Sequence, residues 1–382
     1  MERESMRIMP RIFQPFLTWL TAKPLPEEVG NAYKLTPTFH IAVSFLLLFS
    51  GVYVSAWGYT ESSIITWLIG FIFATSGVKQ LQVLICHNCA HNMVFKGKKN
   101  NNLLGHAISS ILLLKPFDLY KHEHKLHHDP KSLLTDDDDT LSYLKEVVGL
   151  TPSDSINTMW RKLIISAFSP IKIARSIFQR IYQTINSKNI SNLTVTLLIW
   201  LSITYTAIYF EGMEVLFYSW LPPIFIGYHI STTFRLAAEH TWPSPDVLHN
   251  RGIDFVTNAT TGVFIGEALI IKEQSSFFVK SFNILAWSLK MLTFHLLVRL
   301  FIMVGDTPCH DFHHRRPRSK EWPNYITARE RDLRDGSKPF PRNYIDCWGY
   351  INTVSKNFES FRRAKSYYEA TEGNLSTLST EN

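Results

Sequence analysis

The chain has 382 residues, of which 46% are hydrophobic and only 19% are charged. Soluble domains carry roughly 25% charged residues, and the mean hydropathy of −0.02 indicates apolar and polar segments of comparable weight. The net charge is +7, but the basic residues are spread through the connectors between apolar runs, which argues against a nucleic-acid-binding protein. A basic face at an anionic membrane surface, or against an acidic protein partner, is expected instead.

The two ends of the chain and its four cysteines indicate what kind of protein it is. The opening MERESMRIMPRIF has no uninterrupted apolar stretch before Pro15, so no signal peptide is expected. The polar ending NLSTLSTEN is expected to be disordered. Cys86 and Cys89 have the spacing of a redox pair or of half a zinc site. So few cysteines form no disulfide framework, and reduced thiols on a helix are the favoured interpretation.

Four apolar runs are close to the length of about 20 residues that a helix needs to cross a bilayer. They are residues 40–57, 64–85, 193–210 and 215–234. Pro222 and Pro223 should kink the fourth run, which membrane helices tolerate.

Basic residues predict how these runs are oriented. The connectors 58–63 and 211–214 contain no Lys or Arg, and the remaining segments hold the basic residues. The positive-inside rule then places both termini and both long segments in the cytoplasm. We therefore predict an all-α membrane protein with four transmembrane helices as two hairpins and a cytoplasmic helical cap. The expected units are an N-terminal cytoplasmic segment 1–39, hairpins 40–85 and 193–234, cytoplasmic segments 86–192 and 235–368, and a disordered tail 369–382.

A fifth apolar run, residues 282–305, is ambiguous. Its length would allow a crossing, but it contains Lys290, His295 and Arg299, which are costly at the bilayer centre. We predict an interfacial or re-entrant helix there, and the same for the shorter run 103–114.

Histidines cluster just beyond the predicted spans. His87 and His91, in HNCAH, have the i,i+4 spacing that places two side chains on one helical face. Two H-x-x-H-H patterns follow, and a further histidine ends the stretch RLAAEH. These patterns contain His124, His127 and His128, then His310, His313 and His314, and the further histidine is His240.

Such a set of histidines predicts a metal centre. Imidazole suits zinc, copper, iron and nickel, and nine ligands are too many for one ion but suit two ions of four to five ligands each. Redox iron is the candidate at a lipid border, because oxidising an unactivated C–H bond needs metal-bound dioxygen. For the other histidines, solvated or capping roles are expected of His40, His106, His249 and His295, an off-face position of His122, and a buried hydrogen-bonded imidazole of His229.

The order HNCAH, HEHKLHH and HDFHH around two hairpins resembles the three histidine boxes of the integral-membrane fatty acid desaturase and hydroxylase superfamily. The resemblance covers roughly residues 40–316. It implies two iron ions cycling between Fe²⁺ and Fe³⁺, dioxygen as co-substrate, a membrane lipid or fatty acyl substrate, and a separate electron donor of the ferredoxin or cytochrome b5 type. The ligands that it implies are His87, His91, His124, His127, His128, His240, His310, His313 and His314.

The chain departs from some members of that superfamily. Its first box is H-x3-H, where the acyl-CoA type has H-x4-H, and Leu236 stands where that type has an asparagine. A lipid-linked chain or a free acid is therefore favoured over an acyl-CoA. Box three begins with His310 rather than the glutamine of front-end desaturases, and no HPGG-like stretch indicates a fused cytochrome b5 domain.

Several polar residues near the boxes are candidates for supporting roles. Arg235 and Glu239 flank His240 and could orient a ligand imidazole, and Asp129 directly after box two could accept an imidazole N–H. The run 136–139 is interpreted as a solvated acidic loop. Arg315, Arg316 and Arg318 could dock an acidic electron donor or hold the membrane surface.

The predicted activity is an oxygen-dependent desaturase that introduces a double bond into a fatty acyl chain or related lipid. A hydroxylase or ketolase on the same scaffold is the nearest alternative, because only substrate placement separates the two reactions. A zinc-dependent membrane hydrolase would need Glu123 or Glu239 as a general base. A metal carrier would place histidines within the spans rather than beyond them.

Overall fold

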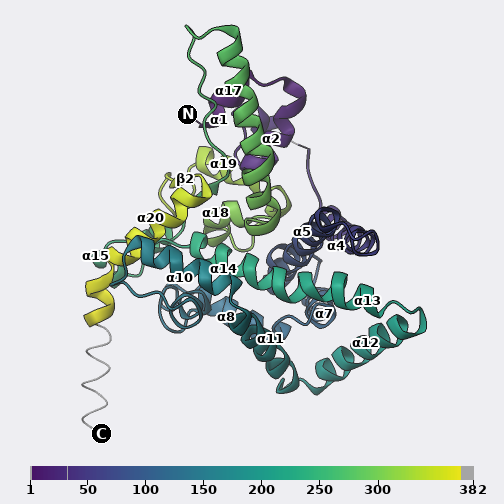
Figure 1. The fold of residues 1–382 in the computed structure, drawn as a ribbon. Coiled ribbons are helices and arrows are strands. Elements are labelled where there is room, and N and C mark those ends of the chain that lie inside the picture. Colours follow the sequence, from purple (N-terminus) through teal and green to yellow (C-terminus); the bar gives the residue numbers. More distant parts are fainter. Residues whose placement is uncertain (1, 32, 371–382) are drawn as a thin grey trace.

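The structure is a computed structural model that describes residues 2–31 and 33–370. Helices dominate these residues, and several long ones extend from a central helical body (Figure 1). Four helices are long and apolar enough to cross a membrane: Pro37–Thr60, Ile64–Ala90, Ile190–Tyr209 and Phe277–Ile302. The prediction of an apolar, mostly helical membrane protein is confirmed. Residues 369 and 370 of the predicted tail are helical, and the rest of that tail lies outside the described residues.

The first apolar pair is α4 (Pro37–Thr60) and α5 (Ile64–Gln80), which pack side by side. Small residues allow this contact, because a Cβ atom added to Gly51 would lie 2.1 Å from the backbone nitrogen of Ala74. A Cβ atom added to Gly70 would lie 2.2 Å from the backbone nitrogen of Ser55. In lipid, where burial of apolar surface does not drive helix association, such close backbone packing holds helices together.

The helix that begins at α5 carries the first histidine box. It continues through a π-helical segment, Leu81–Cys86, into the short α6 (His87–Ala90). A π-helical turn shifts the register of the following residues relative to a regular helix. Cys86 and Cys89 are buried free thiols on this helix, as expected.

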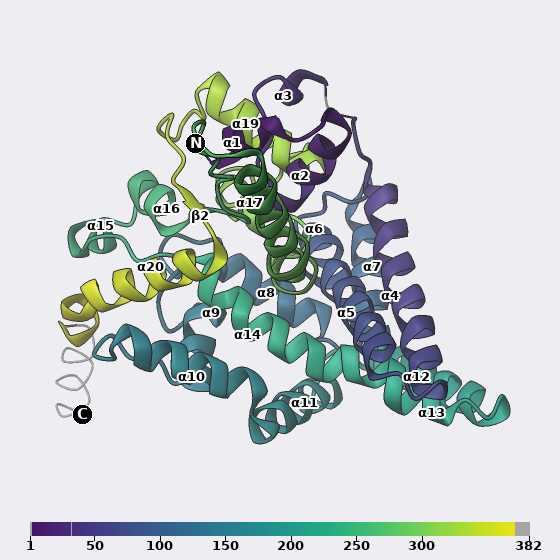
Figure 2. The ribbon, with the colours of Figure 1, turned by 45° about the horizontal axis from the view of Figure 1, so that its top comes forward.

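The segment between the apolar pairs is helical and carries box two. Its elements are α7 (Lys98–Ile111), α8 (Phe117–His127), α9 (Asp139–Ser142), a π-helical segment (Tyr143–Val148), α10 (Ile156–Phe168) and α11 (Pro170–Ile185). The apolar run 103–114 forms most of α7. Helices α10 and α11 lie across the lower side of the body in Figure 2.

The second apolar pair begins with α12 (Ile190–Tyr209). It continues with helical residues 213–239, which comprise α13 (Met213–Val215), two π-helical segments (Leu216–Trp220 and Pro223–Gly227) and α14 (Tyr228–Glu239). Pro222 and Pro223 therefore fall in an irregular part of a helix that continues past them. Helix α14 ends directly before His240, in the central body (Figure 2).

The fourth candidate span differs from the expectation. The fourth helix that is long and apolar enough to span is 277–302, in α17 (Phe277–Lys290) and two π-helical segments (Met291–His295 and Val298–Ile302), whereas we predicted the fourth span at 215–234 from the sequence. Polar side chains in YHISTTF lower the mean hydropathy of 215–234. The apolar FFV at 277–279 extends the apolar run 282–305 toward its N-terminal side.

The charged residues of the 277–302 helix are accommodated by the protein. Arg299 is 2% exposed and donates to the carbonyl of Trp19 at 2.9 Å and to the Tyr325 hydroxyl at 2.6 Å. Lys290 pairs with Glu267, which precedes the helix. Burial and internal hydrogen bonding of Arg299 remove part of the cost that argued against an apolar environment for this run.

The C-terminal part packs against box three. It comprises α18 (His310–Arg315), α19 (Tyr325–Asp335), strand β2 (Asp346–Trp348) and α20 (Tyr350–Arg363). Strand β2 pairs in parallel with β1 (Gly262–Phe264), a short two-stranded element within a chain that is mostly helical, as the predicted all-α class requires. The remaining short helices are α1 (Glu2–Ser5), α2 (Gln14–Thr21), α3 (Glu28–Asn31), α15 (Pro245–His249), α16 (Ile253–Ala259) and 3₁₀ turns at Met6–Ile8, Arg11–Phe13, Thr307–Cys309 and Trp322–Asn324.

A hydrophobic core fixes the end of α14 beside the histidine boxes. Ala238 at this end, Phe255 of α16 and Val354 of α20 are fully buried in one cluster, to which α10 contributes Met159. Burial of such side chains contributes roughly 1.5–3 kcal/mol each. His240, the residue after α14, is thereby held in place by this core and by its β-bridge to Thr260.

Candidate metal centre

The nine histidines predicted from the sequence lie together in the centre of the molecule, in two groups. One group has five members and the other has four, and within each group the candidate ligand atoms all lie within 4.8 Å of one another. The five-histidine cluster contains His87, His91, His124, His128 and His313, and the four-histidine cluster contains His127, His240, His310 and His314.

Each H-x-x-H-H pattern contributes to both clusters. In box two, the i,i+4 pair His124 and His128 joins the five-histidine cluster, and His127 joins the other. In box three the pattern is reversed, because the i,i+4 pair joins the four-histidine cluster and His313 joins the five-histidine cluster. Residues at i and i+4 lie one above the other on a helix, and the residue at i+3 is offset to one side. Helices α8 and α18 therefore lie between the two clusters and serve both.

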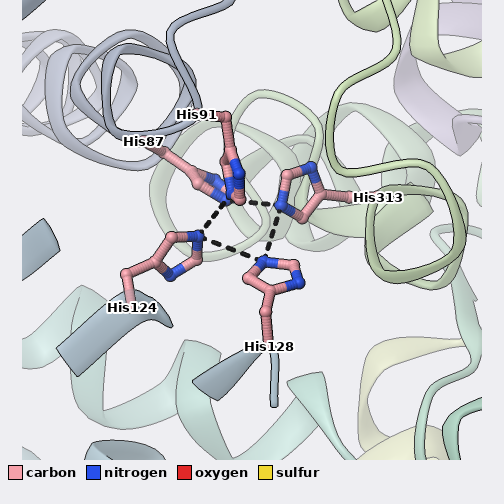
Figure 3. Close-up of side chains that lie close together, drawn as sticks. All are labelled: His87, His91, His124, His128 and His313. Atoms are coloured by element: carbon pink, nitrogen blue, oxygen red, sulfur yellow. Dashed lines mark hydrogen bonds between the residues drawn. The ribbon is translucent and has the colours of Figure 1, made fainter. Parts of the chain in front are cut away.

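The five imidazoles of the first cluster converge through their Nε2 atoms (Figure 3). The Nε2 atom of His87 lies 2.7 Å from that of His313, and the Nε2 atom of His91 lies 2.8 Å from that of His124. His128 closes the ring, with its Nε2 atom 3.1 Å from that of His124 and 3.0 Å from that of His313.

The imidazoles of the four-histidine cluster also face one another through their Nε2 atoms. The Nε2 atom of His127 lies 3.1 Å from that of His240 and 3.3 Å from that of His314. The Nε2 atom of His314 lies 2.9 Å from that of His310. All four side chains are buried.

These distances fit shared metal ions. Metal–imidazole bonds are about 2.0–2.1 Å long, so two nitrogens on one ion lie roughly 3 Å apart. Burial also favours the neutral imidazole that a metal requires, because it lowers the pKa of His240 to about 3 and, together with the Arg318 guanidinium, that of His91 to about 4. The residues present therefore fit two ions.

Several imidazoles are oriented by hydrogen bonds at their other nitrogen. The Nδ1 atom of His87 lies 2.9 Å from the carbonyl of Val83, and that of His240 lies 3.1 Å from the carbonyl of Ala259. A carbonyl accepts an N–H, so each ring presents an unprotonated Nε2 atom to its cluster. This arrangement is typical of histidine that binds metal.

Asp138 orients a third imidazole, a role that we did not predict from the sequence. Its Oδ1 atom lies 2.9 Å from the Nδ1 atom of His127, and its carboxylate is fully buried. Burial opposes the charged imidazole, but the Asp138 carboxylate outweighs this effect and raises the pKa of His127 to about 9. The interpretation of the whole run 136–139 as a solvated loop is therefore wrong at this position. The apolar residues Leu133, Leu134 and Leu141 on both sides of the run were the available signal.

The three supporting residues predicted from the sequence have different outcomes. Arg235 and Glu239 form an ion pair, and the Oε1 atom of Glu239 lies 3.5 Å from the Nε2 atom of His310. Asp129 is exposed and accepts a hydrogen bond from the backbone amide of Lys131 at 3.0 Å. Its proposed contact with a box imidazole is therefore wrong, because its side chain caps the local turn.

A buried ion pair supports box three. The Asp311 carboxylate accepts from Arg329, whose Nε atom lies 2.9 and 3.0 Å from its two oxygens and whose Nη2 atom lies 2.6 Å from Oδ2. Arg329 is 0% exposed and also contacts Asp346 at 2.7 Å. Helix α19, in the segment after box three, thus packs against α18 and stabilises it through this ion pair. No sequence pattern indicated this pairing, because Asp311 and Arg329 lie on two different helices, α18 and α19, whose packing no local spacing reports.

The cationic residues after box three are mostly engaged within the protein. Arg315 is buried, donates to the Ser337 hydroxyl at 3.1 Å and stacks over the Tyr344 ring at 3.7 Å. Arg316 pairs with Asp332 at 2.8 Å. Of the three arginines suggested for donor docking, only Arg318 is exposed.

The other histidines lie outside both clusters. His229 is buried, with its Nε2 atom 3.0 Å from the carbonyl of Ser166, as expected, and His122 is exposed. His40 and His295 are buried rather than solvated. His106 contacts Asn192 at 3.1 Å, and His249 packs on Tyr367.

A cavity of about 640 Å³ adjoins both clusters. Its lining includes His87 and His124 of the five-histidine cluster and His127 and His310 of the four-histidine cluster. Residues of α8, α11 and α14 complete the wall. Asp306 lies in the same lining, and burial raises the pKa of its carboxyl to about 7. A molecule in this cavity would lie beside both groups of imidazoles.

Comparisons with known proteins agree with this site. The chloroplastic omega-6 fatty acid desaturase of Spinacia oleracea is 25% identical over 169 residues, which are 42% of this chain and 36% of that protein. The matched region thus spans about a third of the relative's length. No solved structure gives a significant match. The profile of the family described as fatty acid desaturase matches residues 62–268, more than half of the chain, including boxes one and two and His240. The chain therefore belongs to the fatty acid desaturase family.

Proposed function

We propose that this protein is a membrane-bound, oxygen-dependent desaturase that introduces a double bond into a fatty acyl chain or related lipid, using two iron ions. The observation that carries the proposal is the pair of histidine clusters, one of five and one of four imidazoles, beside a cavity that reaches both. Family membership supports the reaction class. The relative in Spinacia oleracea is described as an omega-6 fatty acid desaturase, which favours an acyl substrate.

The proposed reaction balances with an external source of electrons. The segment –CH₂–CH₂– reacts with O₂, two electrons and two protons to give –CH=CH– and two molecules of water. The iron pair, when bound, supplies the activation of dioxygen that no side chain can supply. The nine histidines would hold the two ions. The hydrogen bonds at the Nδ1 atoms of His87, His127 and His240 would keep these rings oriented.

The protein also controls what surrounds the reacting carbons. All members of the four-histidine cluster and three of the five-histidine cluster are buried, which limits the access of bulk water. The cavity wall would position the acyl chain beside both clusters. Glu239, whose charge is balanced by Arg235, would set the electrostatic environment of His310. Positioning of this kind decides which C–H bonds face the oxidant.

For topology, we propose that the site and both termini are cytoplasmic and that the units follow the predicted boundaries, with helical residues 213–239 as the fourth crossing. A re-entrant course for 277–302 is supported by its contacts with the preceding segment. Trp287 donates to the carbonyl of Glu267 at 2.9 Å, and Lys290 pairs with the same residue. The backbone therefore leads away from Glu267, and the following helix brings Trp287 and Lys290 back beside it. Ser355→Cys and Asp246→Cys are expected to be labelled from the same side in sealed vesicles; labelling from opposite sides would contradict this topology.

A hydrolase is disfavoured by the partners of its candidate bases. Glu123 pairs with Lys115, and Glu239 pairs with Arg235. Neither carboxylate is free to deprotonate a metal-bound water.

The proposed activity is tested by expressing the protein in a host and analysing the total lipids by mass spectrometry. We expect new unsaturated acyl chains, two mass units lighter than their parents, in cells that express the wild type. His128→Ala and His313→Ala should remove them while both variants remain in the membrane fraction, because the apolar helices fold independently of the metal. Products sixteen units heavier would instead identify a hydroxylase.

A further inference from the structure

The two histidine clusters differ in their access to solvent. All four members of the four-histidine cluster are buried, and so are His87, His124 and His313 of the other cluster. His91 and His128 are partly exposed. Both lie just past the end of a helix, His91 after α6 and His128 after α8. The edge formed by these two imidazoles is therefore the exposed part of the nine-histidine centre.

A basic surface borders this edge. We call it the basic rim and define it by residues of three stretches, 91–99, 117–131 and 316–320, all exposed except the partly exposed Lys121. Its members are Lys96, Lys98, Lys99, Lys121, Lys125, Lys131, Arg318 and Lys320. A chain with a net charge of +7 thus concentrates part of its excess charge beside the metal centre.

Specific contacts hold the three stretches together. The indole N–H of Trp322, just beyond the third stretch, donates to the carbonyl of Met93 at 3.1 Å. Lys121 of α8 donates to the side chain of Asn102 in α7 at 2.9 Å. Met93 follows His91 by two residues, so the Trp322 contact brings the third stretch beside the exposed edge of the five-histidine cluster. The basic rim is therefore one surface, and it adjoins an imidazole of the five-histidine cluster.

The charges of the basic rim are largely free of internal partners. Within the described part of the chain, Lys96, Lys125 and Lys320 form no ion pair, and the same holds for Lys98, Lys99 and Arg318. This contrasts with Arg315 and Arg316, which the protein itself engages. Two exposed carboxylates, Asp118 and Asp129, lie in the same stretches, and Asp118 faces His106 at 3.5 Å. The rim retains an uncompensated positive charge.

We propose that the basic rim is the docking surface for an acidic, one-electron protein donor, which delivers electrons at the His91–His128 edge. This inference rests on the proposed function, since the desaturation consumes two electrons for each double bond formed. A donor of the reduced iron–sulfur class would be oxidised by one electron per encounter, so two encounters complete the balance with O₂ and two protons. Complementary charge steers such encounters and orients them.

An anionic lipid surface is the competing occupant, and the side chains around the rim disfavour it. Interfacial helices pair basic residues with large exposed apolar side chains. Helix α11 has this composition, with Ile171 80% exposed and Phe178 69% exposed. Among the exposed large apolar side chains, only Phe95 lies within the three rim stretches. The rim is suited to a soluble polar partner.

The test uses the full-length protein, loaded with iron and placed in nanodiscs of neutral lipid. A reduced plant-type [2Fe–2S] ferredoxin is the probe, and its oxidation is followed by stopped-flow absorbance. Lys98→Glu with Lys99→Glu is the first rim variant, and a carboxylate in the first turn of α7 also suits the helix dipole. Lys125→Glu with Lys320→Glu is the second. Lys272→Glu with Lys356→Glu, at exposed sites outside the rim, makes the same change in net charge.

We expect each rim variant to lower the bimolecular rate by at least about 10-fold at low salt, with the loss shrinking as ionic strength rises. The matched control should change it by less than about 3-fold. Each variant is also reduced with dithionite as a reference. Its rate with ferredoxin is divided by its rate with dithionite, and this ratio is compared between variants. Rim variants that behave like the control would overturn the docking inference and leave the proposed function standing. Rim variants that lose only binding to phosphatidylserine vesicles would also overturn it, in favour of a lipid surface. Protein that takes up no iron would refute the proposed function itself.

Discussion

The Nδ1 atom of His127 lies 2.9 Å from the Oδ1 atom of Asp138, a fully buried carboxylate. The second carboxylate oxygen accepts the backbone amide of Leu134 at 2.9 Å, so the aspartate is itself fixed. This pair sets which nitrogen of His127 faces the four-histidine cluster. In this acidic run Asp136 and Asp137 are exposed, Asp139 lines the cavity, and Asp138 is part of the candidate metal centre.

Replacing Asp138 by asparagine should weaken metal binding without removing a ligand. The neutral amide orients His127 less firmly and withdraws the negative charge that makes the imidazole a stronger ligand. Loss of such a partner typically costs 10–100-fold in metal affinity. Iron affinity, measured by competition with a chelator, is expected to fall by that factor. Asp137→Asn, at the adjacent exposed position, should bind iron as the wild type does; equal losses in both variants would assign no special role to the buried carboxylate.

Replacing Arg329 by methionine should destabilise the protein strongly. The change leaves Asp311 as a buried carboxylate without its cation, which typically costs 3–5 kcal/mol. Thermal unfolding of the variant should therefore begin at a clearly lower temperature. Arg331→Met breaks a more exposed pair with Glu321 and should cost about 1 kcal/mol or less. If the two variants unfold alike, the Asp311–Arg329 pair does not brace box three.

The same network predicts how stability depends on pH. Burial opposes the charge of Asp346, but Arg329 and Lys23 outweigh it and lower the pKa of this carboxyl below its usual range. A depressed pKa contributes stability above the unfolded value of about 3.9, and this contribution is lost as the pH falls through the folded value. The melting temperature should therefore fall as the pH drops below about 4. Asp346→Asn should lower it at pH 7 and flatten that acid slope; an unchanged slope would exclude Asp346 as its source.

Replacing Gly70 by leucine should separate α4 from α5. A Cβ atom at this position would already lie 2.2 Å from the backbone nitrogen of Ser55, so the larger side chain forces the helices apart. Overpacking of this kind costs about 1–3 kcal/mol or more. The yield of folded protein from membranes, measured by size-exclusion chromatography in detergent, should fall. Gly212→Leu is the control, since the nearest atom to its added Cβ lies 3.8 Å away, and a similar loss there would contradict the packing argument.

The candidate ligands were predictable from the sequence because their signal is local. Spacing of three and four residues places His124, His127 and His128 on one side of a helix, and the structure brings them together with the other six. The division of each box between two clusters was not predictable. It depends on how α8 and α18 lie relative to each other, and periodicity reports only the face within one helix.

The missed features depend on contacts between distant segments. Four consecutive aspartates look alike in sequence, and only packing selects Asp138 for burial. Composition also cannot distinguish an arginine that faces lipid from one that faces protein. Arg299 counted against an apolar environment for its helix, yet it is bonded inside the protein.

Metal analysis of the purified protein and of two ligand variants shows whether the two histidine clusters hold two iron ions. We expect about two irons per chain in the wild type. We expect about one iron per chain in His91→Ala and in His240→Ala, because each removes a ligand from a different cluster. One zinc and no iron in the wild type, or two irons retained in both variants, would contradict the proposal of two bound irons.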